Sequence, residues 1–226
     1  MIGKEVGTMS YNVAIDGPAG AGKSTIAKAV AKKMQFIYVD TGAMYRAMAV
    51  YMLGEKIDIH DEDAVSKKSE SADITIRYED GEQQVYLNGD NVTGKLRTEE
   101  VGNTASVISA YPMVRSKLVE LQQALAAKED CIMDGRDIGT CVLPNARVKI
   151  YLTASSLVRA RRRYDELTAK GQKVNLEKIR QDIEERDYQD MHREHSPLRQ
   201  AEDAILVDSS DMTIDEVIER ILELCK

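Results

Sequence analysis

The segment Gly17-Pro-Ala-Gly-Ala-Gly-Lys-Ser24 constrains the fold of this chain more than any other part of its sequence. It matches the pattern G-x-x-x-x-G-K-[ST], follows an apolar strand pattern at residues 12–16, and leads directly into helical spacing over residues 23–34. Glycines let the backbone fold tightly, so several N–H groups point at a bound anion, and the helix N-terminus adds positive partial charge. The segment predicts a loop that binds the phosphates of a nucleoside triphosphate, rather than a chance glycine-rich turn, and it leaves any acceptor open.

The side chains of this loop have distinct expected roles. We expect Lys23 to reach the β- and γ-phosphates, and the Ser24 hydroxyl is a candidate ligand of Mg²⁺. The residues predicted to bind ATP in this segment are Gly17, Pro18, Ala19, Gly20, Ala21, Gly22, Lys23, Ser24 and Thr25.

Strand patterns alternate with helical patterns along most of the chain. Strands are predicted at residues 12–16, 36–40, 131–134, 147–152 and 204–208, and helices at 23–34, 41–53, 99–128 with a break near 111–112, 156–170, 176–194 and 213–224. Thr213 is the expected N-cap of the last helix, and Glu216 completes a capping box. This alternation predicts an α/β fold, with a five-stranded parallel sheet covered by helices on both faces.

The region after residue 71 departs from this pattern. Polar and apolar residues alternate over 73–78 and 84–87, with turn signals at 79–82 and 88–90, which predicts a small antiparallel β insertion near residues 71–95. The role of this insertion is left open by the sequence. We expect a single domain over residues 1–226, with a core of 11–40, 100–155 and 200–226, an acceptor-binding region at 41–99 that contains the insertion, and a lid with its following helix at 156–199.

The composition argues against several classes of protein. The formal net charge of −7 disfavours general binding to nucleic acid, which needs Lys and Arg to neutralise phosphates. The three cysteines include no CxxC pair, and we expect free thiols in a reducing cytoplasm. No window of 18 apolar residues predicts a membrane span, and residues 1–10 lack the apolar segment of a signal peptide. Met9 is an alternative start, with residues 1–8 as an extension.

Charged residues follow the second predicted strand. Asp40-Thr-Gly-Ala-Met-Tyr-Arg46 places Asp40 at the end of that strand and Arg46 on the first turns of the next helix. Because the carboxyl ends of parallel strands meet at one edge of a sheet, Asp40 is expected beside the phosphate loop. A guanidinium fork at Arg46 suits an acceptor phosphate. The alternative is a helix-capping Asp and a surface Arg.

A second charged segment, Asp134-Gly-Arg-Asp137, follows the third predicted strand. Asp134 is expected to act on Mg²⁺ directly or through water. Arg136 and Asp137 are expected in the same crevice, where a carboxylate can accept hydrogen bonds from an exocyclic amine and so distinguish cytosine from uracil. The alternative is a turn with solvated charges.

Arginines are also concentrated in the two charged helices that follow residue 155. Arg159-Ala-Arg-Arg-Arg163 opens the first, and Arg186, Asp190 and Arg193 are spaced to share one face of the second. A solvated, salt-bridged surface is the usual reading of such runs. Since phosphoryl transfer is catalysed mainly by cationic clamping and positioning, we favour a mobile lid that closes over the phosphates, with Arg159 and Arg162 on ATP.

These segments, together with Glu185-Arg-Asp-Tyr-Gln-Asp190, closely resemble those of bacterial-type cytidylate kinases, which are P-loop nucleoside monophosphate kinases. The resemblance runs from Asn12 to the last helix. It implies transfer of the γ-phosphoryl group of ATP, with Mg²⁺, to CMP or dCMP, with UMP used less well. It also implies a five-stranded core with an acceptor-binding region, an insertion typical of the bacterial form and a lid. We expect a monomer that binds neither nucleic acid nor membranes.

The resemblance also assigns residues to the acceptor. Ser106, Arg115 and Asp137 fall where the family reads the cytosine ring, Arg46, Arg136 and Arg193 where it holds the acceptor phosphate, and Arg186 and Asp190 near the sugar. Asp40, Thr41 and Tyr45 complete the predicted substrate site, Lys23, Arg136 and Arg193 are the predicted catalytic residues, and Ser24 and Asp134 the predicted metal ligands.

Three alternatives remain open at this stage. The chain could be a P-loop kinase for another acceptor, such as UMP, AMP or shikimate, although two sets of arginines favour a phosphorylated acceptor. It could be a non-catalytic nucleotide-binding regulator. Binding of RNA by the basic lid is disfavoured by the acidic net charge and by an aromatic content of 5%.

Overall fold

Five parallel strands form the central sheet, in the order β2-β6-β1-β7-β8. The computed structural model describes residues 10–226, so the expectation about Met9 lies outside the described residues. The strands are β1 (Asn12–Asp16), β2 (Ile37–Asp40), β6 (Cys131–Gly135), β7 (Val148–Thr153) and β8 (Ile205–Asp208). β1 is central, pairing with β6 in the register Asn12–Cys131 and with β7 in the register Val13–Val148. The predicted parallel sheet is confirmed, and β2 and β8 are its edges.

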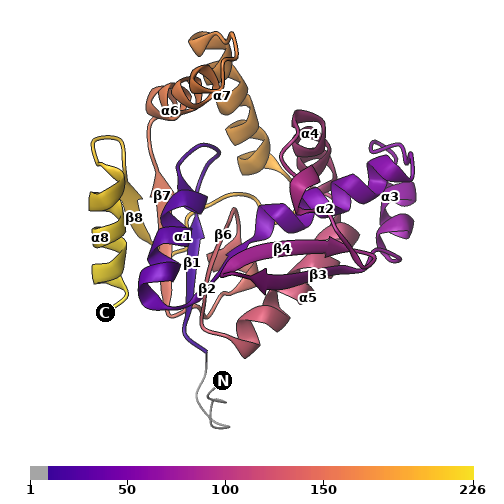
Figure 1. Cartoon of the computed structure of the whole chain (residues 1–226), viewed down its shortest axis with the longest axis horizontal. Coiled ribbons are helices and arrows are strands. Elements are labelled where there is room, and N and C mark those ends of the chain that lie inside the picture. Colours follow the sequence, from indigo (N-terminus) through magenta and orange to yellow (C-terminus); the bar gives the residue numbers. More distant parts are fainter. Residues whose placement is uncertain (1–9) are drawn as a thin grey trace.

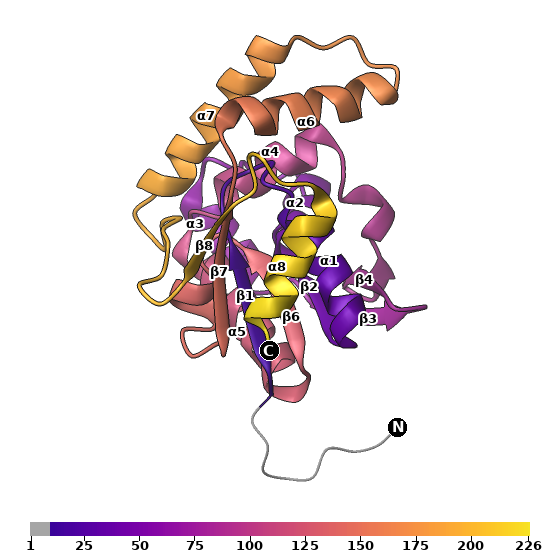
Figure 2. The ribbon, with the colours of Figure 1, turned by 90° about the vertical axis from the view of Figure 1, so that its left-hand side faces the viewer.

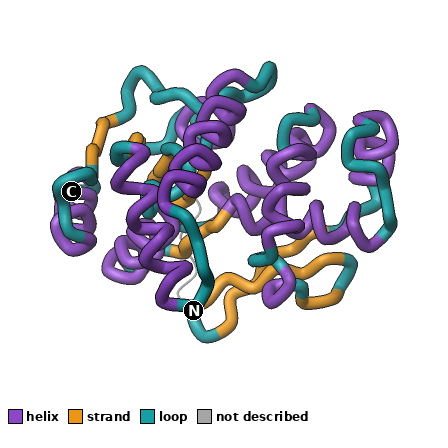
Figure 3. The backbone as a smooth tube through the Cα atoms, turned by 90° about the horizontal axis from the view of Figure 1, so that it is seen from above, coloured by secondary structure: helices purple, strands orange, loops and turns teal. Residues whose placement is uncertain are grey.

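Helices cover both faces of this sheet (Figures 1 and 3). The helices of the described residues are α1 (Lys23–Met34), α2 (Thr41–Gly54), α3 (Glu62–Ser69), α4 (Glu99–Ile108), α5 (Pro112–Lys128), α6 (Ser156–Ala169), α7 (Leu176–His192) and α8 (Ile214–Leu224). Thr213 caps α8 in a capping box with Glu216, as predicted. Short turns lie at Thr93–Lys95 and, as a π-helical turn called η2, at Ile138–Val142.

Alternation along the strands divides the core into two parts. Val13 and Ile15 of β1 point to one face of the sheet and pack with α1 and α8, whereas Ala14 points to the other face. That second face packs against α2, α4 and α5, and its core continues into the antiparallel insertion through Val85 and Leu87. The insertion therefore shares a hydrophobic core with the face of the sheet that packs against α2, α4 and α5.

The insertion is a three-stranded antiparallel sheet of β3 (Ile74–Glu79), β4 (Glu82–Leu87) and β5 (Asp90–Asn91), as the turn signals predicted. It lies beside the central sheet below α2, whereas α6 and α7 form a helical pair above the carboxyl edge of the strands (Figures 1 and 2). Within residues 10–226, no helix is long and apolar enough to cross a membrane.

Two features of the helices differ from the sequence predictions. The short helix α3 was not predicted; it begins after Asp61, whose carboxylate accepts a hydrogen bond from the Ala64 N–H. The helix predicted over 176–194 ends at His192, so the prediction that Arg193 shares a helical face with Arg186 and Asp190 is wrong. Arg193 is extended (φ −63°, ψ 144°), because the chain turns back there and the Leu198 N–H bonds to the carbonyl of Asp190.

Candidate active site

The loop between β1 and α1 requires glycine at several positions. Gly17 has φ 151°, and a Cβ there would lie 1.9 Å from the carbonyl oxygen of Leu152. Gly20 (φ 74°) and Gly22 (φ 86°) are in left-handed conformations that side chains disfavour. The N-cap of α1, Gly22, has no side-chain cap, so the helix N-terminus is open toward the cavity that the loop lines. This geometry suits a bound phosphate.

Lys23 is folded back onto this loop. Its Nζ donates to the carbonyl oxygens of Gly17 at 2.7 Å and Pro18 at 2.8 Å, and the residue is 6% exposed. Burial lowers the pKa of the Lys23 ammonium, and the nearby Arg136 lowers it further. A phosphate would replace two neutral carbonyls with an anionic partner, so a bound anion would favour the charged form.

Ser24 and Asp134 meet at the end of the strands. The Ser24 hydroxyl donates to Asp134 Oδ2 at 3.0 Å, and the Tyr38 hydroxyl donates to Asp134 Oδ1 at 2.7 Å. Burial raises the pKa of Asp134, and the neighbouring carboxylate of Asp40 raises it further. A hydroxyl and a carboxylate are the hard oxygen donors that Mg²⁺ prefers, and this buried negative charge would be stabilised by a cation. Residues 10–226 contain no group of three or more His, Cys, Asp or Glu side chains that could hold a metal ion.

Asp40 holds two arginines at the start of α2. Its carboxylate caps the helix by accepting from the Ala43 N–H at 2.9 Å. It also accepts from Arg46 Nη2 at 3.0 Å and from Arg97 Nη2 at 2.9 Å. Gly42 leaves room for this arrangement, because a Cβ there would lie 3.0 Å from Arg46 Nη1. Asp40 therefore orients two guanidinium groups along one wall of the site.

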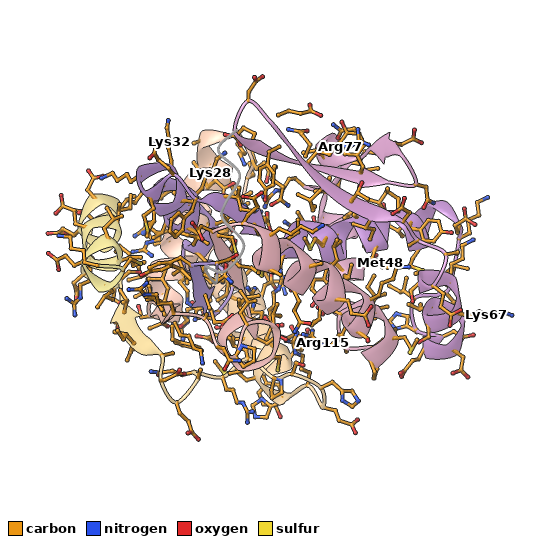
Figure 4. The ribbon with its side chains drawn as sticks, turned by 90° about the horizontal axis from the view of Figure 1, so that it is seen from below. Lys28, Lys32, Met48, Lys67, Arg77 and Arg115 are labelled. Atoms are coloured by element: carbon orange, nitrogen blue, oxygen red, sulfur yellow. The ribbon has the colours of Figure 1, made fainter. Side chains whose placement is uncertain are left out.

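Asp137 and Arg115 form a buried ion pair across the cavity from the loop. Arg115 Nη2 donates to Asp137 Oδ2, and its Nη1 donates to the carbonyl of Ser109 at 3.1 Å. Arg193 Nη2 lies 3.7 Å from Asp137 Oδ1. The Arg115 guanidinium also stacks over the ring of Tyr45, at 5.6 Å from its centroid. Arg115 lies toward the centre of the molecule, whereas Lys67 lies at its periphery (Figure 4).

Several arginines lie close together between the loop and the Asp137–Arg115 pair. Arg136 Nε donates to Asp190 Oδ2 at 2.7 Å. Burial lowers the pKa of Arg186, and so does the adjacent guanidinium of Arg136. The pKa values of Arg46 and Arg193 are likewise lowered, first by burial and then also by neighbouring arginines. Buried cations that repel one another favour an anionic ligand between them.

Several buried polar atoms of residues that line the cavity have no hydrogen-bond partner within the described part of the chain. They include the Tyr45 hydroxyl, Arg46 Nε and Arg193 Nη2. Buried polar groups are normally paired, so unpaired ones that line a cavity are suited to a polar ligand.

The helices α6 and α7 contact the loop between β1 and α1 through Arg159. Its guanidinium donates to the carbonyls of Ala154 and Ala19, both at 2.8 Å, and pairs with Asp187 at 2.7 Å. Asp187 in turn accepts from the Ala19 N–H at 3.3 Å. Arg162 donates to the carbonyl of Ser209 at 2.7 Å. In this conformation, Arg159 holds α6 and α7 against the loop rather than pointing freely into the site.

One cavity of about 790 Å³ connects the loop with the Asp137 end. All of the predicted site residues line it except Gly17 and Pro18, whose carbonyls hold Lys23 instead. Thr41 lines it too, but its hydroxyl donates to the carbonyl of Asp134 at 2.7 Å and so supports the strand end. The glycine-rich loop, the carboxylates with their arginine partners and the neighbouring arginines therefore line a single chamber.

Several residues that line this chamber, or that bond to residues lining it, are not predicted from the sequence. Arg97 and Tyr38 bond to the predicted residues Asp40 and Asp134, and Met212 and Ile214 form part of the wall beside Arg162. Asp187 and Tyr38 had a local signal, since Asp187 lies within the charged segment that contains Arg186 and Asp190, and Tyr38 lies in the strand predicted at residues 36–40. Arg97, Met212 and Ile214 lie outside the motifs.

Fold and site together define a P-loop phosphotransferase with a second cationic pocket facing its loop. The sequence model of the cytidylate kinase family matches residues 13–226. The chain is 52% identical over 223 residues to the cytidylate kinase of Listeria innocua, covering 97% of both proteins. It is 50% identical over 212 residues to that of Lactobacillus johnsonii, covering 94% of this chain and 92% of that protein. The chain belongs to the cytidylate kinase family.

A solved structure of an uncharacterised protein from Eubacterium ventriosum is also similar, with a TM-score of 0.50. The match covers 95% of this chain and 97% of that one, at 10% identity. At such low identity the likeness concerns the fold alone.

Proposed function

We propose that this enzyme transfers the γ-phosphoryl group of ATP to CMP or dCMP, giving ADP and CDP or dCDP. The observation that carries the proposal is the single chamber, which has a phosphate loop at one end and the buried Asp137–Arg115 pair with its surrounding arginines at the other. Two phosphorylated substrates can face each other in such a chamber, which is what in-line transfer requires.

At the donor end, the loop N–H groups and the N-terminus of α1 would bind the ATP phosphates. Lys23 would leave the carbonyls of Gly17 and Pro18 and pair with the β- and γ-phosphates. The nucleoside would lie toward Arg162 and the apolar wall formed by Met212 and Ile214.

Ser24 and Asp134 would hold Mg²⁺. When bound, the ion supplies neutralisation of charge on the β- and γ-phosphate oxygens. Tyr38 would keep the Asp134 carboxylate in place by its hydrogen bond.

At the acceptor end, Arg46, Arg136 and Arg193 would bind the CMP phosphate, with Arg186 and Asp190 near the sugar. Their mutual repulsion would be relieved by a dianionic phosphate. No strong general base is required, because the attacking phosphate oxygen is already anionic. The transfer would proceed without a covalent enzyme intermediate.

Asp137, held by Arg115, would accept a hydrogen bond from the exocyclic amine of cytosine, with Ser106 beside it. Uracil presents a carbonyl oxygen at that position, which would face a carboxylate. A site built for an N–H donor rejects a substrate without one, so UMP would be the weaker acceptor.

Residues 156–199 would act as a lid over the chamber. Arg159 and Asp187 already bond this segment to Ala19 of the loop. Closure of the lid would bring the arginines of α6 and α7 toward the transferred group and would exclude water.

The test is ADP production in a coupled assay with ATP–Mg²⁺ and each of CMP, dCMP, UMP, AMP, GMP and shikimate. We expect fast turnover with CMP and dCMP and slower turnover with UMP. Turnover only with another acceptor would retain the P-loop kinase but reject the cytosine pocket. ATP binding without turnover on any acceptor would favour a regulatory protein.

A further inference from the structure

A side-chain amide of the antiparallel insertion forms two hydrogen bonds to the edge of the central sheet. Gln83 Oε1 accepts a hydrogen bond from the Asp40 N–H at 2.8 Å, and Gln83 Nε2 donates to the Asp40 carbonyl at 3.2 Å. Asp40 is the last residue of β2, an edge strand to which no further strand of residues 10–226 is paired on the outer side. A carboxamide has both a donor and an acceptor, as a peptide group does. Gln83 therefore makes the two hydrogen bonds to Asp40 that a peptide group of an adjacent strand would make.

The residue opposite Gln83 in the hairpin also contacts β2. Tyr78 is the cross-strand partner of Gln83, and its hydroxyl donates to the carbonyl of Tyr38 in β2 at 3.0 Å. Lys28 of α1 pairs with Glu82 at the hairpin turn. Lys28 and Arg77 of β3 lie on the same side of the molecule (Figure 4). The tip of the insertion is therefore attached to the carboxyl end of β2 and to α1.

This attachment is made at Asp40, the residue that orients Arg46 and Arg97. The Asp40 carboxylate holds Arg46 and Arg97, and the Asp40 backbone is held by Gln83. A displacement of that backbone would move both guanidinium groups together.

We propose that Gln83 is a positioning residue, through which the insertion fixes Asp40 and thereby aims Arg46 and Arg97 at the acceptor phosphate. This inference rests on the proposed function of the site. It assigns the insertion a role in acceptor affinity, without contact between Gln83 and the substrate.

The neighbouring residue Gln84 provides a matched control. It has the same side chain in the same strand, but it points to the opposite face, where its Oε1 accepts from Asn91 Nδ2 at 3.1 Å. Gln83→Ala and Gln84→Ala each remove one partly buried glutamine from β4, and only the first frees Asp40.

The variants are compared by calorimetric binding of CMP without ATP, by KM for each substrate, and by thermal unfolding. We expect Gln83→Ala to raise the Kd and KM for CMP on the order of tenfold, because misplaced binding groups weaken the site, while KM for ATP changes less than about twofold. Gln84→Ala should leave all three constants unchanged. Gln83→Glu, which keeps the acceptor but loses the donor to the Asp40 carbonyl, should also weaken CMP.

A merely structural role for Gln83 would lower the melting temperature and leave the constants for CMP unchanged, and that result would overturn the proposal. If the Gln83 variants do not fold, hydrogen exchange of the unaltered protein decides. CMP, but not ATP, should slow exchange at the backbone of residues 82–87, and no slowing there would refute the coupling.

Failure of the proposed function and failure of the role of Gln83 give different experimental results. If the unaltered protein neither binds nor phosphorylates CMP, the proposed function is wrong. If it does both and Gln83→Ala behaves like Gln84→Ala, only the role of Gln83 is wrong.

Discussion

Replacement of Asp137 by Asn tests the reading of the acceptor base. The side chains of Asp137 and Arg115 are 7% and 6% exposed, so the ion pair between them is almost fully desolvated. Asn keeps the shape of Asp but removes the charge, and its amide can turn an N–H donor toward the base. A charge-assisted hydrogen bond contributes about 1.5–3 kcal/mol, so we expect kcat/KM for CMP to fall about 10- to 150-fold.

The effect on UMP should be smaller or opposite, because an N–H donor suits the uracil carbonyl. The ratio of kcat/KM for CMP to that for UMP should therefore fall at least about tenfold. Both constants are measured in the coupled assay on one preparation.

Stability needs a separate control, because Asp137→Asn also leaves the buried Arg115 without its partner. Loss of one member of a buried pair costs about 3–5 kcal/mol. In a chain of this size that corresponds to a fall in melting temperature of roughly 6–20 °C. The double variant Arg115→Gln/Asp137→Asn removes both charges and should recover part of this loss while the CMP-to-UMP ratio stays low. A lower melting temperature with an unchanged ratio would refute the assignment of Asp137 to the base.

Two further predictions concern Lys23 and Asp16. Lys23→Ala should reduce kcat by at least about 10²-fold while circular dichroism shows an intact fold, since Lys23 would neutralise charge that develops during transfer; nearly normal turnover would contradict the assignment of the loop. Asp16, which accepts from the N–H groups of Ile138 at 2.8 Å and Gly139 at 2.7 Å, has its pKa raised from 3.8 to about 6, chiefly by burial. The folded state therefore binds this proton more tightly than the unfolded state, and the stability of the unaltered protein loses about 2 kcal/mol from this group as pH rises from 4 to 6. The free energy of unfolding in urea is compared between Asp16→Asn and the unaltered protein. The difference between the two should change in favour of Asp16→Asn by about the same amount over this pH interval; a difference that does not change with pH would show that Asp16 does not titrate there.

Local patterns were sufficient to predict much of the fold. The glycine-rich loop and the helix over Lys23–Met34 follow from adjacent residues, and the capping box at Thr213 from residues three apart. The helix α3 escaped prediction because it has only eight residues and buries only Val65 and Ser69. Arg193 was placed in a helix because its spacing from Asp190 continues the pattern, although the chain turns back after His192.

The predicted site residues were those with a motif beside them, whereas the missed ones are defined by distant partners. Arg97 and Gln83 contact Asp40 from 57 and 43 residues away, and nothing in their own neighbourhood marks them. Arg159 stands in a charge run that indicates a cationic lid. Only the structure shows that its guanidinium is bonded to Ala19, Ala154 and Asp187.

The most direct test of the account is to follow the γ-phosphate itself. ATP labelled with ³²P at the γ-position is mixed with the enzyme, Mg²⁺ and CMP, and the products are separated from the protein. Direct transfer across one chamber predicts that the label appears in CDP, with little in inorganic phosphate and none on the protein. Label that accumulates on the protein, or that appears as inorganic phosphate while no labelled CDP forms, would contradict the account.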